Sequence, residues 1–229
     1  MTSKARRSSR SSRKRPAATS AALDGSLERL GTDRVELFWA HVEDRSVPLE
    51  EQVAGLAALV ADGRAAQLGA SNHAAWRVER ARRLAADAGV EPFTAVQLRH
   101  TYLQPVPFVP LPDGGHVVAS PEALDFVATE GLAFWVYSSL LMGAYARDDR
   151  PFQEAYRHPD TERRLAALDR VSAMTGATRN QIVLAWLMRA TPAATPIVGV
   201  SSTSQLDEAM DARDLTLDAD ALAVLDLHS

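Results

Sequence analysis

The chain has 229 residues, of which 46% are hydrophobic and 24% are charged, as is typical of a globular protein with one domain or two small ones. It contains no cysteine, which excludes disulfides, thiol catalysis and thiolate metal sites and favours a cytoplasmic location. No apolar run approaches the roughly 20 residues that span a bilayer, so we expect no membrane association.

The charge is divided unevenly along the chain. Residues 1–20 contain seven Lys and Arg and no acid, so the net charge of −4 for the whole chain leaves −11 for the rest. We expect this Arg/Ser-rich leader to be disordered, because it has too few apolar side chains to bury a core. A basic arm can bind nucleic acid, but the acidic body opposes such binding, so a nucleic-acid binder is only a minor alternative.

From residue 21 onward, the hydrophobic pattern predicts helices that alternate with short apolar strands. A stripe of Leu23, Leu27 and Leu30 indicates a first helix that ends at Gly31. In chain order, the pattern then predicts a strand over 35–41, helix 48–61, strand 65–72, helix 74–88, strand 94–98, helix 121–130, strand 132–137, helices 161–175 and 180–189, strand 196–200 and a helix over 203–212. This alternation indicates a parallel α/β architecture in one domain over residues 21–229.

The apolar run that begins at Ala65 ends abruptly in two small polar residues, Ser71 and Asn72. In parallel α/β proteins, ligands bind where strands end in loops, so these two side chains are candidate site residues. The alternative is that they only cap the helix that follows.

Several segments together resemble aldo-keto reductases, in the same order and at suitable spacing. They are Gly25-Ser-Leu-Glu-Arg-Leu-Gly-Thr-Asp33, Leu37-Phe-Trp-Ala-His41, Leu68-Gly-Ala-Ser-Asn72, Tyr137-Ser-Ser-Leu140 and Ile197-Val-Gly-Val-Ser-Ser202. The resemblance implies a (β/α)8 barrel of the TIM type that uses NADPH, with NADH as the alternative, to reduce small aldehydes or ketones to alcohols. It also implies that the chain carries strands four to eight, so we expect a truncated, partial barrel.

The resemblance also implies roles for individual residues. His41 is similar to the active-site histidine that polarises the substrate carbonyl. Ser71, Asn72 and Gln97 are similar to the residues that bind the nicotinamide carboxamide, and Tyr137 is similar to the aromatic residue that stacks on the nicotinamide ring, unless it only packs in the core. The remaining cofactor residues are Ser138 and Leu140 at the pyrophosphate, Gly199, Ser201 and Gln205 over the adenosine phosphate, and Glu208 at the adenine.

The sequence also departs from the family pattern. The loop from Gly199 to Gln205 has neither lysine nor arginine to hold a 2′-phosphate, and Ala209 stands where some members have an adenine-binding asparagine. The family's proton-donating tyrosine and its aspartate belong to the second barrel unit, which is absent here. Ser3-Lys4 is similar to the pair that contains the family's catalytic lysine, so Lys4 is a second catalytic candidate.

Three expectations follow from these departures. We expect weak carbonyl reduction, with a catalytically inactive remnant or a cofactor-binding protein as the alternative. Leu37, Leu68 and Val96 should face solvent or a void, because the strands that would cover them are missing. His100, in the segment where relatives often have an aromatic residue, should either face the substrate or lie on the surface.

Overall fold

The computed structural model describes residues 14–111 and 114–227, and it divides into two compact units. Unit 1 ends at Val96 and unit 2 begins at Gln97. Lys4, one of the two predicted catalytic residues, lies outside the described residues.

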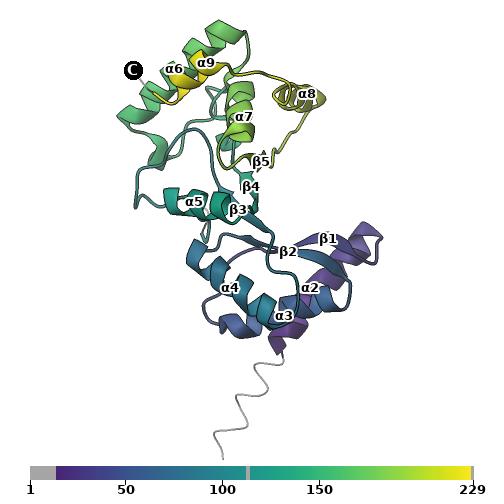
Figure 1. Cartoon of the computed structure of the whole chain (residues 1–229). Helices are drawn as coiled ribbons and strands as arrows, with labels where there is room; N and C mark the ends of the chain where they lie inside the picture. Colours follow the sequence, from purple (N-terminus) through teal and green to yellow (C-terminus); the bar gives the residue numbers. More distant parts are fainter. Residues whose placement is uncertain (1–13, 112–113, 228–229) are drawn as a thin grey trace, which may run out of the picture. The chain divides into compact units, whose positions relative to one another are not determined.

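Unit 1 is a parallel strand pair with helices on one side (Figure 1). Strand β1 pairs with β2 so that Trp39 stands opposite Gly69, and the N–H of Thr94 donates to the carbonyl of Leu68 at 2.9 Å as the chain enters β3. Its elements are α2 (Lys14–Leu30), β1 (Val35–Ala40), α3 (Leu49–Ala61), β2 (Ala65–Ser71) and α4 (Ala75–Asp87), followed by β3 (Ala95–Arg99), which crosses into unit 2.

The sequence of α3 explains both of its ends. Pro48 precedes the helix, and Glu50 and Glu51 lie in its first turn, where carboxylates interact favourably with the helix dipole. Asp62 closes the helix, and Gly63 then turns the chain with a φ of 80°, a left-handed conformation that glycine adopts without steric cost. The chain therefore passes directly from α3 into β2.

Two of the side chains expected to face solvent or a void are buried instead. Leu68 and Val96 are fully or almost fully buried, and only Leu37 is half-exposed. Gln67, next to Leu68, is exposed, so side-chain alternation turns Leu68 to the opposite face of β2, where α3 packs. The expectation was wrong for Leu68, because α3 covers its face of β2, and it was wrong for Val96, which is 3% exposed in β3.

Unit 2 contains a second parallel pair, β4 with β5, in which Phe134 stands opposite Ala194. The N–H of His100, just after β3, donates to the carbonyl of Tyr137 at the end of β4 at 3.3 Å. Its elements are α5 (Pro121–Thr129), β4 (Ala133–Tyr137), the 3-10 turns η1 (Leu141–Gly143) and η2 (Glu154–Tyr156), α6 (Pro159–Thr175), α7 (Arg179–Arg189), β5 (Ala194–Pro196), α8 (Thr203–Asp211) and α9 (Ala219–Leu225).

Helices α7 and α8 contact one another, and each begins with a side-chain cap. Thr178 and Gln181 form a capping box at the start of α7, and the Ser202 side chain accepts from the N–H of Gln205 at the start of α8. These caps fix the first turns of α7 and α8, both of which contribute side chains to the site described below.

The predicted α/β architecture with parallel strands is confirmed, with three differences in extent. Strand β5 covers 194–196 rather than 196–200, because its pairing with β4 ends at Pro196, and the backbone bond that follows runs from Ile197 N to Val136 O at 2.7 Å. Helix α2 begins at Lys14, inside the predicted leader, and α9 was not predicted. None of the described helices is both long and apolar enough to cross a membrane.

Candidate functional site

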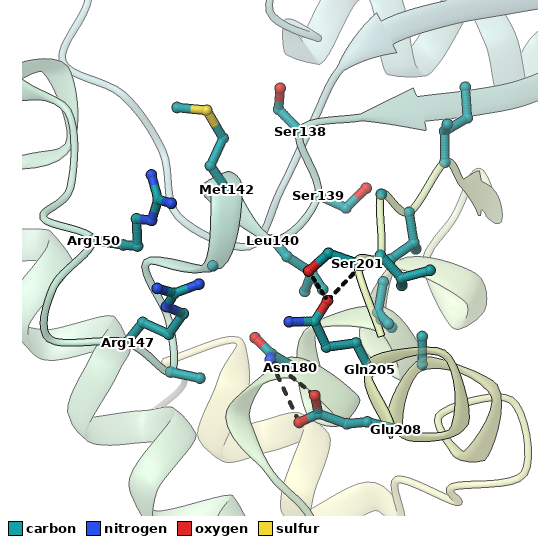
Figure 2. Close-up of a pocket in the computed structure, with 18 residues that line it drawn as sticks. Ser138, Ser139, Leu140, Met142, Arg147, Arg150, Asn180, Ser201, Gln205 and Glu208 are labelled. Atoms are coloured by element: carbon teal, nitrogen blue, oxygen red, sulfur yellow. Dashed lines mark hydrogen bonds between the residues drawn. The ribbon is translucent and has the colours of Figure 1, made fainter. Parts of the chain in front are cut away.

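A pocket of about 550 Å³ lies entirely within unit 2 (Figure 2). Its walls come from the turn after β4, the start of α7, the loop after β5 and the first turns of α8. The residues that line it include Ser138, Leu140, Arg147, Arg150, Asn180, Gly199, Ser201, Gln205, Glu208 and Ala209. Six of them were predicted as cofactor residues from the sequence, so segments some 60 residues apart in the chain converge on one cavity.

The backbone is unusual where the chain leaves the strands. Ser138, directly after β4, and Asn72, directly after β2, have φ values of 56° and 59°. Non-glycine residues seldom adopt this left-handed conformation, and when they do they often lie at functional sites. In both units, a predicted site residue therefore sits at a sharp turn at the carboxyl end of a strand.

The loop after β5 is held in shape by Gln205. Its side-chain oxygen Oε1 accepts from the N–H of Ser201 at 2.8 Å and from the Ser201 hydroxyl at 3.1 Å (Figure 2). This bidentate contact ties the start of α8 to the loop that contains Gly199. Ser201 and Gln205, two of the three residues predicted to close over the adenosine phosphate, are therefore joined in one wall of the pocket.

Glu208 is positioned by helix α7. Its carboxylate accepts from the Thr178 hydroxyl at 2.6 Å and from Nδ2 of Asn180 at 3.4 and 3.3 Å. Figure 2 shows Glu208 and Asn180 together at one end of the pocket. A negative charge therefore lies where the sequence predicted an adenine contact.

Two cations line the pocket from the loop that follows η1. Arg147 forms a bidentate ion pair with Asp149, at 2.9 and 2.6 Å, and this pair lowers the pKa of the Asp149 carboxyl. Arg150 has no ion pair among the described residues. Both side chains are exposed, and in the view of Figure 2 they stand across the pocket from Ser201 and Gln205. The pocket thus has a cationic wall that the loop after β5 does not provide.

The predicted site residues of unit 1 also come together. Nδ2 of Asn72 donates to the carbonyl of His41 at 3.2 Å and to the hydroxyl of Ser71 at 3.0 Å. Ser71 and Asn72 are buried, whereas His41 is exposed and lines a separate pocket of about 390 Å³ within unit 1. Asn72 therefore links the carboxyl ends of β1 and β2.

Gln97 and Tyr137 do not line the unit 2 pocket. Gln97 is half-buried in β3, and the half-buried ring of Tyr137 is met edge-on by His116, with ring centroids 5.0 Å apart. Their predicted contacts with the nicotinamide remain predictions, as does the catalytic role of Lys4.

His100 is not a surface residue. It is 7% exposed and lies against the rings of Phe134 and Trp186, each with its centroid 6.0 Å away. Burial lowers the pKa of His100 to about 4, so the imidazole is neutral near neutral pH. The ring behaves as part of the unit 2 core.

Three of the four tyrosines are committed to the interior of unit 2. The Tyr102 hydroxyl donates to the carbonyl of Leu225 at 2.7 Å, the Tyr145 hydroxyl is 2.8 Å from the Thr101 hydroxyl, and the Tyr156 hydroxyl accepts from Arg99 Nε at 3.2 Å. Burial raises the pKa of Tyr102 to about 12 and also raises the pKa of Tyr145. These three hydroxyls are structural groups.

Among the residues of the unit 2 pocket that sequence reasoning missed are Asn180, Arg147 and Arg150. Asn180 follows a capping threonine and reads as an ordinary first-turn residue of a helix. The two arginines could have been suspected from the sequence. The loop from Gly199 to Gln205 has no cation, and Arg147 and Arg150 follow the end of another strand, where ligands also bind. Among the described residues, no cluster of three or more His, Asp or Glu side chains could hold a metal ion.

Comparison with known proteins gives consistent matches. A family model described as "Aldo/keto reductase family" matches residues 1–229. The chain is 27% identical over 203 residues to versiconal hemiacetal acetate reductase of Aspergillus parasiticus, covering 82% of this chain and 55% of that protein. It is 27% identical over 229 residues to L-glyceraldehyde 3-phosphate reductase of Escherichia coli O157:H7, covering 91% of this chain and 62% of that protein.

A solved structure agrees with these matches. The crystal structure of a thermostable aldo-keto reductase, Tm1743, with the inhibitor epalrestat superposes with a TM-score of 0.67 at 25% identity, covering 94% of this chain and 67% of that one. The chain spans about half the length of the curated relatives it matches. The similarity confirms the predicted α/β fold of the TIM-barrel type.

Proposed function

The chain belongs to the aldo/keto reductase family, and from that membership we propose that it binds a nicotinamide dinucleotide and uses it to reduce an aldehyde or ketone to an alcohol. The unit 2 pocket carries the proposal. It gathers Ser138, Leu140, Gly199, Ser201, Gln205 and Glu208, all of which the sequence motifs had assigned to the cofactor. The motifs give no distances, so this convergence is independent support for a dinucleotide site.

The chemistry of the pocket suits the adenosine diphosphate half of such a cofactor. Its volume of about 550 Å³ falls within the range of small-molecule sites. The Ser138 hydroxyl is a hydrogen-bond donor for a phosphate oxygen, and Glu208 is an acceptor for an amine. The pocket walls thus carry both a donor and an acceptor that a nucleoside diphosphate could use.

NADPH is the proposed cofactor, with NADH as the alternative. Arg147 and Arg150 are the only cations among the residues that line this pocket. A 2′-phosphate binds favourably to guanidinium groups, and Arg150 forms no salt bridge among the described residues. We propose that the loop after η1 supplies the charge that the loop after β5 lacks.

When bound, the dinucleotide supplies the hydride. His41, exposed in its own pocket of unit 1, is proposed to polarise the substrate carbonyl, as the family resemblance implies. Tyr102, Tyr145 and Tyr156 are unsuited to donate the proton, because burial and internal hydrogen bonds occupy their hydroxyls. We therefore propose that turnover is slow, since general acid catalysis contributes roughly 100- to 10,000-fold.

The same observation favours a second candidate, a cofactor-binding protein without catalysis. Its pocket chemistry would be identical, but the bound cofactor would not turn over at all. The two candidates differ in one measurable property, which is turnover of the bound cofactor.

The test combines a binding measurement with an assay on the full chain. NADPH is titrated by calorimetry, and oxidation of NADPH is then followed with a panel of small aldehydes. Gln205→Leu, which removes the contact to Ser201, should weaken NADPH binding, whereas His41→Asn should leave binding intact and abolish turnover. Binding without turnover would favour the second candidate, and failure to bind both NADPH and, in a parallel titration, NADH would contradict both.

A further inference from the structure

The amide of Asn180 is oriented by its neighbours rather than by solvent. Its Nδ2 donates to both carboxylate oxygens of Glu208, at 3.4 and 3.3 Å. A carboxylate only accepts hydrogen bonds, so the amide nitrogen must face Glu208 and the amide oxygen must face away. The hydroxyl of Thr178 donates to the same carboxylate at 2.6 Å, which holds Glu208 in place.

The oxygen Oδ1 of Asn180 is an acceptor without a donor. Asn180 is 9% exposed and lines the unit 2 pocket, and its Oδ1 is buried with no hydrogen-bond partner among the described residues. Figure 2 shows this oxygen on the pocket side of the amide, opposite the two bonds to Glu208. Buried side-chain acceptors in folded proteins are nearly always paired, so an unpaired one on a pocket wall indicates a donor that arrives with a ligand.

From this geometry we infer that Asn180 recognises the adenine ring of the bound dinucleotide by accepting a hydrogen bond from its exocyclic amine. This inference rests on the proposed cofactor-binding function and extends it to a residue outside the sequence motifs. The amide that some aldo-keto reductases carry next to the adenine-binding glutamate is replaced here by Ala209, which lines the same pocket. Asn180 supplies an amide oxygen from helix α7 instead.

The chemistry of the ligand matches the pair of acceptors. The exocyclic amine of adenine has two N–H groups, and Glu208 and Asn180 Oδ1 together offer an acceptor for each. Hypoxanthine has a carbonyl at the same position, which cannot donate and would face two acceptors.

The experiment compares two cofactors that differ only at this position. NADPH and its deamino form, with hypoxanthine in place of adenine, are each titrated by calorimetry into the full chain and two variants. The variants are Asn180→Leu, which removes the acceptor at similar volume, and Asn180→Leu combined with Ala209→Asn, which returns an amide to the neighbouring position. Circular dichroism melts check that each variant is folded.

The unmodified chain should bind NADPH about five- to tenfold more tightly than the deamino form, which corresponds to one hydrogen bond. Asn180→Leu should lose this preference by weakening NADPH alone, and the double variant should recover it in part. Equal loss of affinity for both cofactors, or an unchanged preference in Asn180→Leu, would overturn the inference while leaving the proposed function intact. If the unmodified chain binds neither cofactor, the proposed function itself fails and the inference fails with it.

Discussion

Replacing Gly69 by alanine should destabilise the chain, because β2 has no room for a side chain there. A Cβ added to Gly69 would lie 2.5 Å from Cζ3 and 2.9 Å from Cδ2 of Trp39, which stands opposite Gly69 in the register of β1 and β2. Overpacking of this kind costs about 1–3 kcal/mol. The entropic gain from replacing glycine is only about 0.4–1 kcal/mol, so the clash should dominate.

Urea unfolding followed by circular dichroism measures this effect. Gly114→Ala is the matched control, because no atom lies within 4 Å of its Cβ position, and it should leave stability unchanged or slightly higher. Adding Trp39→Leu to Gly69→Ala should remove the clash, so the double variant should be more stable than the sum of the single effects predicts. If Gly69→Ala is as stable as the Gly114→Ala control, the close packing of Trp39 on Gly69 is wrong.

Three other predictions concern the interior and the cofactor. The free energy of unfolding should fall by up to about 3 kcal/mol as the pH falls from about 6.5 to about 4. Burial lowers the pKa of His100 to about 4, so the unfolded chain binds the proton more tightly than the folded chain does. Acid unfolding of His100→Phe should lack this component. Tyr102→Phe should lower the free energy of unfolding by about 1–2 kcal/mol in urea titrations, since the Leu225 carbonyl loses its donor. Arg150→Gln should weaken NADPH binding about tenfold and leave NADH binding unchanged in calorimetric titrations, and equal effects on both cofactors would count against the proposed cation site.

Much of the fold could be predicted because each strand is a short apolar run between turn formers. Strand β1 was predicted over 35–41 and observed over Val35–Ala40, and β2 was predicted over 65–72 and observed over Ala65–Ser71. Strand β5 was misjudged because Ile197 to Val200 look like a strand in the sequence, while the pairing with β4 ends at Pro196. Hydrophobic periodicity shows which side chains are apolar, but it does not show where pairing with a neighbouring strand ends.

The site was predictable where motifs carry it and not where packing creates it. Ser138 and Gln205 were recognised from short motifs, and the structure brings both to one pocket. Asn180 could not be recognised, because a residue after a capping threonine gives no sign that its amide oxygen will lack a donor. The environment of Leu68 was misjudged for a related reason, since the face that α3 covers depends on strand register.

A crystal structure of the chain with NADP⁺ would show directly whether the unit 2 pocket holds the adenosine half of a nicotinamide dinucleotide. We expect the adenine to lie beside Glu208 and Asn180, and the 2′-phosphate to lie within hydrogen-bond distance of Arg147 or Arg150. Cofactor density elsewhere on the chain, with this pocket empty at saturating NADP⁺, would contradict this expectation.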